Sequence, residues 1–208
     1  SKVVKAPKFD ASLSIQPGDK EIGFKTSMQT PQTFVAILDY GDVPYTPQSR
    51  AAAIVAGQIL TNRLLSTVRE DMGAVYSIWA SGAMQRVADK DNTVVQSVFP
   101  MKPEMKKEVL EFIAKEFKNM EGNVTEEELA KVVEFSIKNV KEAQEQNEAW
   151  LNGMAGEALN GVDTFHGAEE MYKAMKPADI QDFMKSLNNQ GNYRVIYLDP
   201  ETTEAAAE

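Results

Sequence analysis

The sequence contains no cysteine and only one histidine, His166, among its 208 residues. The absence of cysteine excludes disulfides, zinc sites built from thiolates and cysteine nucleophiles, and it leaves the redox compartment open. A Ser-His-Asp triad would need His166, but the chain has no nucleophile elbow. Gly-rich phosphate-binding motifs are absent as well. Several common catalytic classes are therefore excluded at the outset.

The single histidine also limits metal chemistry. His166, Glu169 and Glu170 read H-x-x-E-E, one substitution away from the H-x-x-E-H of inverted zincins. A zinc hydrolase needs three protein ligands, normally including imidazoles, and a carboxylate stands here at the second imidazole position. A pair of glutamates at the start of a helix is already explained by the helix dipole. We expect no metal site in this chain.

Basic patches and long apolar runs are lacking too. The formal net charge is −9, and duplex nucleic acid needs a clustered basic face, so no nucleic-acid partner is expected. No apolar run reaches the length of a membrane span, and no signal peptide is visible. Carboxylate runs such as Glu126 to Glu128 have the setting of exposed helix N-termini, so they are interpreted as solvated.

What the sequence does contain is a mixture of strand and helix patterns. Strand-like runs cover 21–27, 33–40, 74–84, 93–99 and 193–198, and the short 29–32 connection predicts that the first two strands are antiparallel neighbours. Helices are predicted from Thr46 as N-cap to about Glu70, with Gly73 as stop, and from Pro103 to Gly122. Further helices are predicted after a Thr125–Glu128 capping box, around 150–159, and from 177 to 187.

Because the strands cluster instead of alternating one for one with helices, this order predicts an α+β fold. We expect a two-layer sandwich with a mostly antiparallel sheet and helices packed on one face. Residues 19–201 form the expected domain. Residues 1–18 are interpreted as a linker from a missing N-terminal part, and 202–208 as a frayed tail.

The stretch from Leu60 to Ser77 resembles the C-terminal domain of the pitrilysin or insulinase-like zinc metallopeptidases, which are inverted zincins. Arg69, Glu70, Gly73 and Tyr76, followed by Ser, stand at the family's spacing, while a Val replaces the usual Leu before the Arg. The weaker likeness of the remaining chain extends from about 21 to 201. The resemblance implies the LuxS/MPP-like type of α+β fold.

The resemblance also implies a function. In this family zinc and the catalytic Glu belong to an N-terminal half, and the C-terminal half contributes an Arg and a Tyr that contact the substrate backbone near the scissile bond. Carried over, these are Arg69 and Tyr76, with Glu70 as a possible supporting residue. Fixed donors of this kind stabilise the charge that develops on the carbonyl oxygen. No cofactor is expected in this chain, and zinc is expected in the missing half or a partner.

The expected partners are a peptide or protein substrate and an N-terminal peptidase half or homologous subunit, and the isolated chain is expected to be inactive. Two alternatives stay open. One is a non-catalytic structural subunit, as in relatives among respiratory-complex core proteins, and the other is a free-standing peptide-binding module. The compartment is undetermined, with the periplasm or cell envelope of a Gram-negative bacterium as the working expectation.

Overall fold

The computed structural model describes residues 16–87 and 90–201. The strands are β1 (Lys20–Thr26), β2 (Thr33–Gly41), β3 (Ala80–Val87), β4 (Lys90–Met101) and β5 (Tyr193–Pro200). The helices are α1 (Pro47–Leu64), α2 (Lys106–Asn119), α3 (Glu126–Gln144), α4 (Asn147–Asn160), α5 (Ala168–Ala174) and α6 (Pro177–Asn188). A π-helix, Leu65–Asp71, continues α1, and a 3-10 turn, Pro103–Met105, precedes α2.

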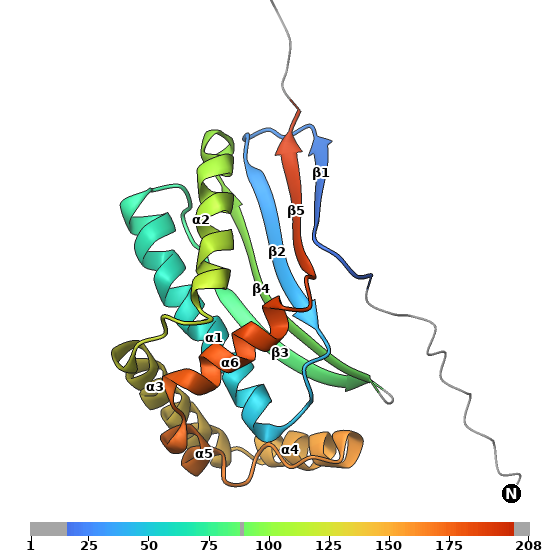
Figure 1. The fold of residues 1–208 in the computed structure, drawn as a ribbon, viewed down its shortest axis with the longest axis vertical. Helices are drawn as coiled ribbons and strands as arrows, with labels where there is room; N and C mark the ends of the chain where they lie inside the picture. The colour runs from blue at the N-terminus through green and yellow to red at the C-terminus, as the bar shows by residue number, and fades with distance from the viewer. Residues whose placement is uncertain (1–15, 88–89, 202–208) are drawn as a thin grey trace, which may run out of the picture.

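The strands form one sheet in the order β1-β5-β2-β4-β3. Only the β1–β5 pair is parallel among the described strands, and the other pairs are antiparallel. Helices α1, α2 and α6 lie together on one side of this sheet, with α3, α4 and α5 beyond one end (Figure 1). The expected α+β sandwich with a mostly antiparallel sheet is therefore confirmed.

The predicted pairing of the first two strands is wrong. Strand β5, from the far end of the chain, lies between β1 and β2, with Leu198 opposite both Phe24 and Phe34. Neighbouring strands are about 4.8 Å apart, so the 27–32 connection is long enough to cross one intervening strand. Turn signals in the sequence are local, and they do not record that a distant segment fills the gap.

Helix α1 begins as the sequence predicts. Thr46 Oγ1 accepts a hydrogen bond from Ser49 N at 3.0 Å, and Ser49 Oγ accepts one from Thr46 N. Pro47 occupies the first turn of the helix. Together with its π continuation, the segment Pro47–Asp71 is the one helix in the described part of the chain that is long and apolar enough to cross a membrane. Since 56% of that window is buried, it is the core helix of the domain.

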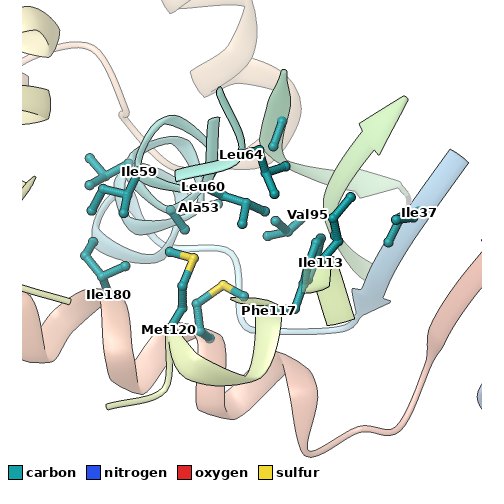
Figure 2. Close-up of a cluster of buried hydrophobic side chains, with 14 of the residues drawn as sticks. Ile37, Ala53, Ile59, Leu60, Leu64, Val95, Ile113, Phe117, Met120 and Ile180 are labelled. Atoms are coloured by element: carbon teal, nitrogen blue, oxygen red, sulfur yellow. The ribbon is translucent and has the colours of Figure 1, made fainter. Parts of the chain in front are cut away.

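The core lies between α1, the sheet and the helices packed on α1. Figure 2 shows this cluster, to which α1, the sheet, α2 and α6 all contribute; its labelled members include Ile37, Ile59, Leu60, Leu64, Val95, Ile113, Phe117 and Ile180. Helix α1 approaches β3 most closely where Gly57 meets Gly82, and side chains at these two positions would collide with backbone. This close crossing sets the distance between α1 and the sheet.

The other helices agree with the sequence signals that predict them. Thr125 and Glu128 form the reciprocal capping box that opens α3, and Pro177 stands at the start of α6. Of the predicted linker, residues 1–15 lie outside the described residues, and so does the predicted tail, 202–208. Gly18 is attached to the domain, because its backbone N donates to Asn192 Oδ1 at 2.9 Å.

Candidate functional site

The candidate site begins where α1 widens into the π-helix. Met72 N donates to Thr67 O at 2.9 Å, and Ala74 N donates to Val68 O at 3.0 Å, so the chain leaves the helix through wide turns. Gly73 sits between these bonds with φ of 62°, in the left-handed region that favours glycine. π-Helical turns inside longer helices are frequent at functional sites. The local geometry thus marks this helix end as unusual.

The loop 74–79 that follows is held against the domain at both ends. Lys102 N donates to Ala74 O at 3.0 Å, and Ser97 Oγ donates to Trp79 O at 2.7 Å. Val75 and Ile78 are buried within the same loop. One backbone hydrogen bond, one side-chain hydrogen bond and two buried side chains therefore hold the loop against β4 and the residue that follows it.

Tyr76 is displayed on this fixed loop. Its side chain is 88% exposed, although its neighbours Ala74 and Val75 are buried. It borders a groove of about 390 Å³, whose walls come from the loop, the start of β2 and the end of β4: Pro31, Gln32, Gly73, Ala74, Val75, Tyr76, Pro100, Met101 and Lys102. A phenol offers one donor and an acceptor, so Tyr76 presents a hydrogen-bonding group at the mouth of a mostly apolar groove.

The strand predicted over 74–84 begins too early, so its placement of Tyr76 within a strand is wrong. Strand β3 begins at Ala80, and its first ladder partner is Ser97. The apolar pattern from residue 74 onward predicts a strand, but Val75 and Ile78 are buried as loop residues above the core. The consequence is that Tyr76 belongs to a loop outside the sheet.

Arg69 and Glu70 lie in the last turn of the π-helix, and both are exposed. Neither side chain lines the groove beside Tyr76. Within residues 16–87 and 90–201, the structure records no hydrogen bond or ion pair for the side chains of Arg69, Glu70 or Tyr76. The three predicted residues therefore lie around one helix end, and among the described residues no hydrogen bond joins Arg69 to Tyr76.

One residue near this site was not singled out from the sequence. Arg63, in the last turn of α1, donates to Glu116 of α2 at 3.1 Å and to Glu128 of α3 at 2.7 Å. Its Nη2 also donates to Asn123 O at 3.1 Å. Burial disfavours the charged form of Arg63, but the hydrogen bonds and charges of Glu128 and Glu116 together raise its pKa. Arg63 therefore anchors the helix end that carries Arg69. Its role can be recognised only from its contacts with residues that are distant in the sequence.

The glutamates next to His166 do not form a metal site with it. Glu169 is paired with Lys141 at 3.1 Å and with Lys173 at 2.6 Å. Instead, His166 Nδ1 lies 2.7 Å from Asp163 Oδ2, and potential ligand atoms of Glu157, Asp163 and His166 lie within 4.8 Å of one another.

This second cluster does not fit a peptidase zinc. Asp163 Oδ1 already accepts from the backbone N atoms of Phe165 and His166, at 2.9 and 3.0 Å. These hydrogen bonds lower the pKa of Asp163, which is a normal property of a turn-forming aspartate. The cluster offers a single imidazole, and Glu157 and His166 are exposed, so water is not excluded from it.

Comparison with known proteins identifies the class to which this fold and helix end belong. The family model described as the Peptidase M16 inactive domain matches residues 2–135. No curated protein sequence matches the chain. The family match covers more than half of the chain, and it includes α1, the π-helix and the Tyr76 loop.

Solved structures of low identity share the fold. The ferredoxin protease FusC, solved as an E83A mutant with Arabidopsis ferredoxin, superposes with a TM-score of 0.77 at 16% identity, over 94% of this chain and 22% of that one. The periplasmic protease PqqL from Escherichia coli gives 0.77 at 17% identity, over 97% and 22%. A peptidase M16 inactive domain from Pseudomonas fluorescens gives 0.65 at 15%, over 91% and 45%.

The fold and this helix end are those of a non-catalytic domain of the M16 peptidases. The chain belongs to the Peptidase M16 inactive domain family, which confirms the resemblance to the pitrilysin-like metallopeptidases. It spans less than a quarter of the two proteases and less than half of the Pseudomonas chain.

Proposed function

We propose that this chain is the substrate-binding, C-terminal half of a zinc-dependent metalloendopeptidase. In this role Arg69 and Tyr76 contact the peptide backbone beside the scissile bond. Zinc and the catalytic Glu come from an N-terminal half or a partner subunit. The family match and the high exposure of Tyr76 on its fixed loop support this role.

Tyr76 is the observation that carries the proposal. An exposed phenol on a mobile loop would mean little, but the hydrogen bonds of Ala74 and Trp79 hold this loop to β4. Holding a donor in place before the substrate arrives lowers the reorganisation that catalysis requires. Arg69 adds a positive charge at the same helix end.

The companion half is inferred from the chemistry that this chain lacks. Its donor set around His166 does not fit a peptidase zinc, and no second imidazole occurs in the sequence. The matched proteases are more than four times as long as the aligned segment, which leaves room for a separate zinc-bearing half. The substrate would then lie between that half and the edge formed by Tyr76.

The proposal is tested by measuring zinc binding and peptide cleavage, first with the isolated chain and then with the zinc-bearing half added. The isolated chain is expected to cleave no peptide, and the two halves together are expected to restore zinc-dependent cleavage. His166→Ala serves as the control for adventitious zinc on the exposed cluster. Zinc-dependent proteolysis by the 208 residues alone would refute the assignment.

A second candidate is a non-catalytic partner subunit of the same family. Arg69 lies outside the groove that Tyr76 borders, and this separation is the observation that favours it. Such a subunit would stabilise an active partner without contacting the substrate. The two candidates differ in one result, because Arg69→Ala and Tyr76→Phe would then leave turnover by the assembled enzyme unchanged.

A further inference from the structure

Two hollows between helices α1 and α3 meet to form one groove, here called the α1–α3 groove. The first has a volume of about 350 Å³ and is lined by Gln58, Thr61, Asn62, Lys131, Val132 and Phe135. The second has about 220 Å³, and its walls include Arg50, Ile54 and Gln58 of α1 and Ser136, Asn139 and Val140 of α3. Gln58 lines both hollows, so they adjoin at this side chain.

The groove begins at the end of α1 that leads to the candidate site. Its first hollow includes Asn62, and α1 then continues into the π-helix that carries Arg69. From Asn62 the groove follows α1 back to Arg50, which lies about 18 Å away at 1.5 Å per residue. About five residues of extended peptide cover this length at about 3.4 Å each. A substrate bound at the candidate site could therefore continue along the groove.

The groove offers side-chain amides to a ligand. Each of Gln58, Asn62 and Asn139 carries an NH₂ donor and a carbonyl acceptor. Within residues 16–87 and 90–201, the structure records no side-chain hydrogen bond for Asn62 or Asn139, and Gln58 only accepts one, from Ser136 Oγ at 3.4 Å. An extended peptide presents a backbone donor and an acceptor at every residue other than proline. These amides therefore complement a peptide backbone.

The two ends of the groove differ in chemistry. At the Asn62 end the Phe135 ring is 53% exposed, although Val132 beside it is buried. An exposed ring next to a buried aliphatic side chain provides a contact for an apolar group. At the other end stands Arg50, whose guanidinium has no recorded ion pair in the described part of the chain. A guanidinium preferentially binds carboxylates.

We propose that the α1–α3 groove binds an extended segment of the peptide substrate. An apolar side chain of this segment lies against Phe135, and a carboxylate about five residues away binds Arg50. The carboxylate belongs either to an acidic side chain or to the C-terminus of the peptide. The inference rests on the proposed function and adds a substrate class to it: peptides with an apolar residue and a carboxylate at this spacing.

Binding is tested first on the isolated, ¹⁵N-labelled chain. The probe is an amidated alanine–serine peptide with one Phe and one Glu about five residues apart, made in both orders. We expect the side-chain amide signals of Gln58, Asn62 and Asn139 to shift. The signal of Asn188, which donates to Phe117 O outside the groove, should not shift. No saturable binding up to about 1 mM peptide would overturn the proposal.

Substitutions in the peptide show which groups the groove recognises. Replacing its Phe by Ala, or its Glu by Gln, should weaken binding to the natural chain about tenfold. A peptide that ends at the Glu position with a free carboxylate and no Glu distinguishes a C-terminus from an acidic side chain. Undiminished binding of the Ala and Gln peptides would contradict the assigned contacts, and this result does not depend on the folding of any protein variant.

Substitutions in the protein place these contacts. Phe135→Ala and Arg50→Gln should each weaken the Phe–Glu peptide about tenfold, and Arg50→Gln should no longer distinguish Glu from Gln in the peptide. Phe24→Ala removes a ring of similar exposure from β1, and Lys138→Gln removes an exposed cation of α3 that does not line the groove. Both controls should bind as the natural chain does. Equal affinities of Phe135→Ala and Phe24→Ala would overturn the proposal.

The assembled enzyme separates this inference from the proposed function. We expect peptides that carry the carboxylate to be cleaved with about tenfold higher kcat/KM, and Arg50→Gln to remove the difference. Cleavage that depends on neither the carboxylate nor Arg50 would overturn the groove assignment and leave the proposed function standing. Binding in the groove of the isolated chain, without cleavage by the assembled enzyme, would refute the proposed function instead.

Discussion

Arg63 binds Glu128 through two hydrogen bonds, from Nε to Oε1 at 2.7 Å and from Nη2 to Oε2 at 3.0 Å. Glu128 Oε2 also accepts from Thr125 N at 3.0 Å, which makes the same carboxylate part of the capping box of α3. The end of α1 is thereby tied to the start of α3. Since the π-helix and Arg69 follow within one to two turns, this pair sets where the candidate site begins.

Replacing Arg63 should destabilise the domain. Arg63→Ala leaves Glu116 and Glu128 without their cation in a partly buried setting, at a cost of roughly 2–4 kcal/mol. Urea unfolding followed by circular dichroism measures the change. Lys131→Ala removes a cation from an exposed i,i+4 pair with Glu127, where solvent screens the charges, and should have a much smaller effect. Equal effects of the two substitutions would show that the Arg63 network is unimportant.

Asp39 gives the domain a pH dependence. It is 2% exposed in the central strand β2, and burial raises its pKa to about 7 from the ordinary 3.8, helped by the charge of Asp19. The folded state then binds more protons than the unfolded state between these values. Stability is therefore lost as pH rises from about 4 to about 7, and the shift corresponds to about 4 kcal/mol at the limit.

Asp39→Asn removes this titration. The variant should gain stability relative to the natural chain as pH is raised from about 5 to about 8, because the amide never has to be buried as an anion. Urea unfolding at several pH values measures the difference. Asp42→Asn, three residues further along at an exposed position, is the matched control. Its free energy of unfolding should change with pH as that of the natural chain does. A pH-independent difference for Asp39→Asn would refute the assigned titration.

Much of the fold could be predicted because its signals are local. Thr46 and Pro47 fix the start of α1, and Thr125 with Glu128 fixes the start of α3. The place of β5 between β1 and β2 could not be predicted, because it depends on pairing between the two ends of the chain. The start of β3 was missed for a similar reason: Val75 and Ile78 have strand-like character but are buried through a loop.

The candidate site also has one part that local sequence predicts and another that depends on long-range contacts. The spacing from Arg69 to Tyr76 is a sequence property, so the family resemblance could be found without a structure. The support of the site is not local. Two hydrogen bonds, from Lys102 N to Ala74 O and from Arg63 to Glu128, join residues far apart in the chain. The hydrophobic periodicity of the sequence does not predict such bonds.

The Gly57–Gly82 crossing should tolerate no side chain. A Cβ at Gly82 would collide with the Ala53 carbonyl oxygen, which belongs to the backbone of α1 and cannot move aside. Gly82→Ala should therefore cost about 3 kcal/mol or prevent folding, in line with overpacking of a close contact. Gly122→Ala, where a Cβ meets nothing within 4 Å, is the control and should be nearly neutral. Thermal unfolding compares the two, and equal melting temperatures would contradict the crossing geometry.

Tyr76→Phe separates catalysis from folding. Tyr76 has no intramolecular hydrogen bond among the described residues, so losing the hydroxyl should change the free energy of unfolding by less than about 0.5 kcal/mol. The proposed function predicts that, in an enzyme assembled with a zinc-bearing half, losing this donor to the developing oxyanion lowers kcat by about two to three orders of magnitude.

A fall in kcat with little change in KM would indicate that the hydroxyl acts in the transition state rather than in substrate binding. Tyr40→Phe is the matched control, because Tyr40 donates its hydroxyl to Gln16 O, away from the Tyr76 groove. It should leave turnover unchanged. If Tyr76→Phe and Tyr40→Phe are equally active, the exposed phenol of the 74–79 loop serves no catalytic purpose, and the chain is better described as a structural partner subunit.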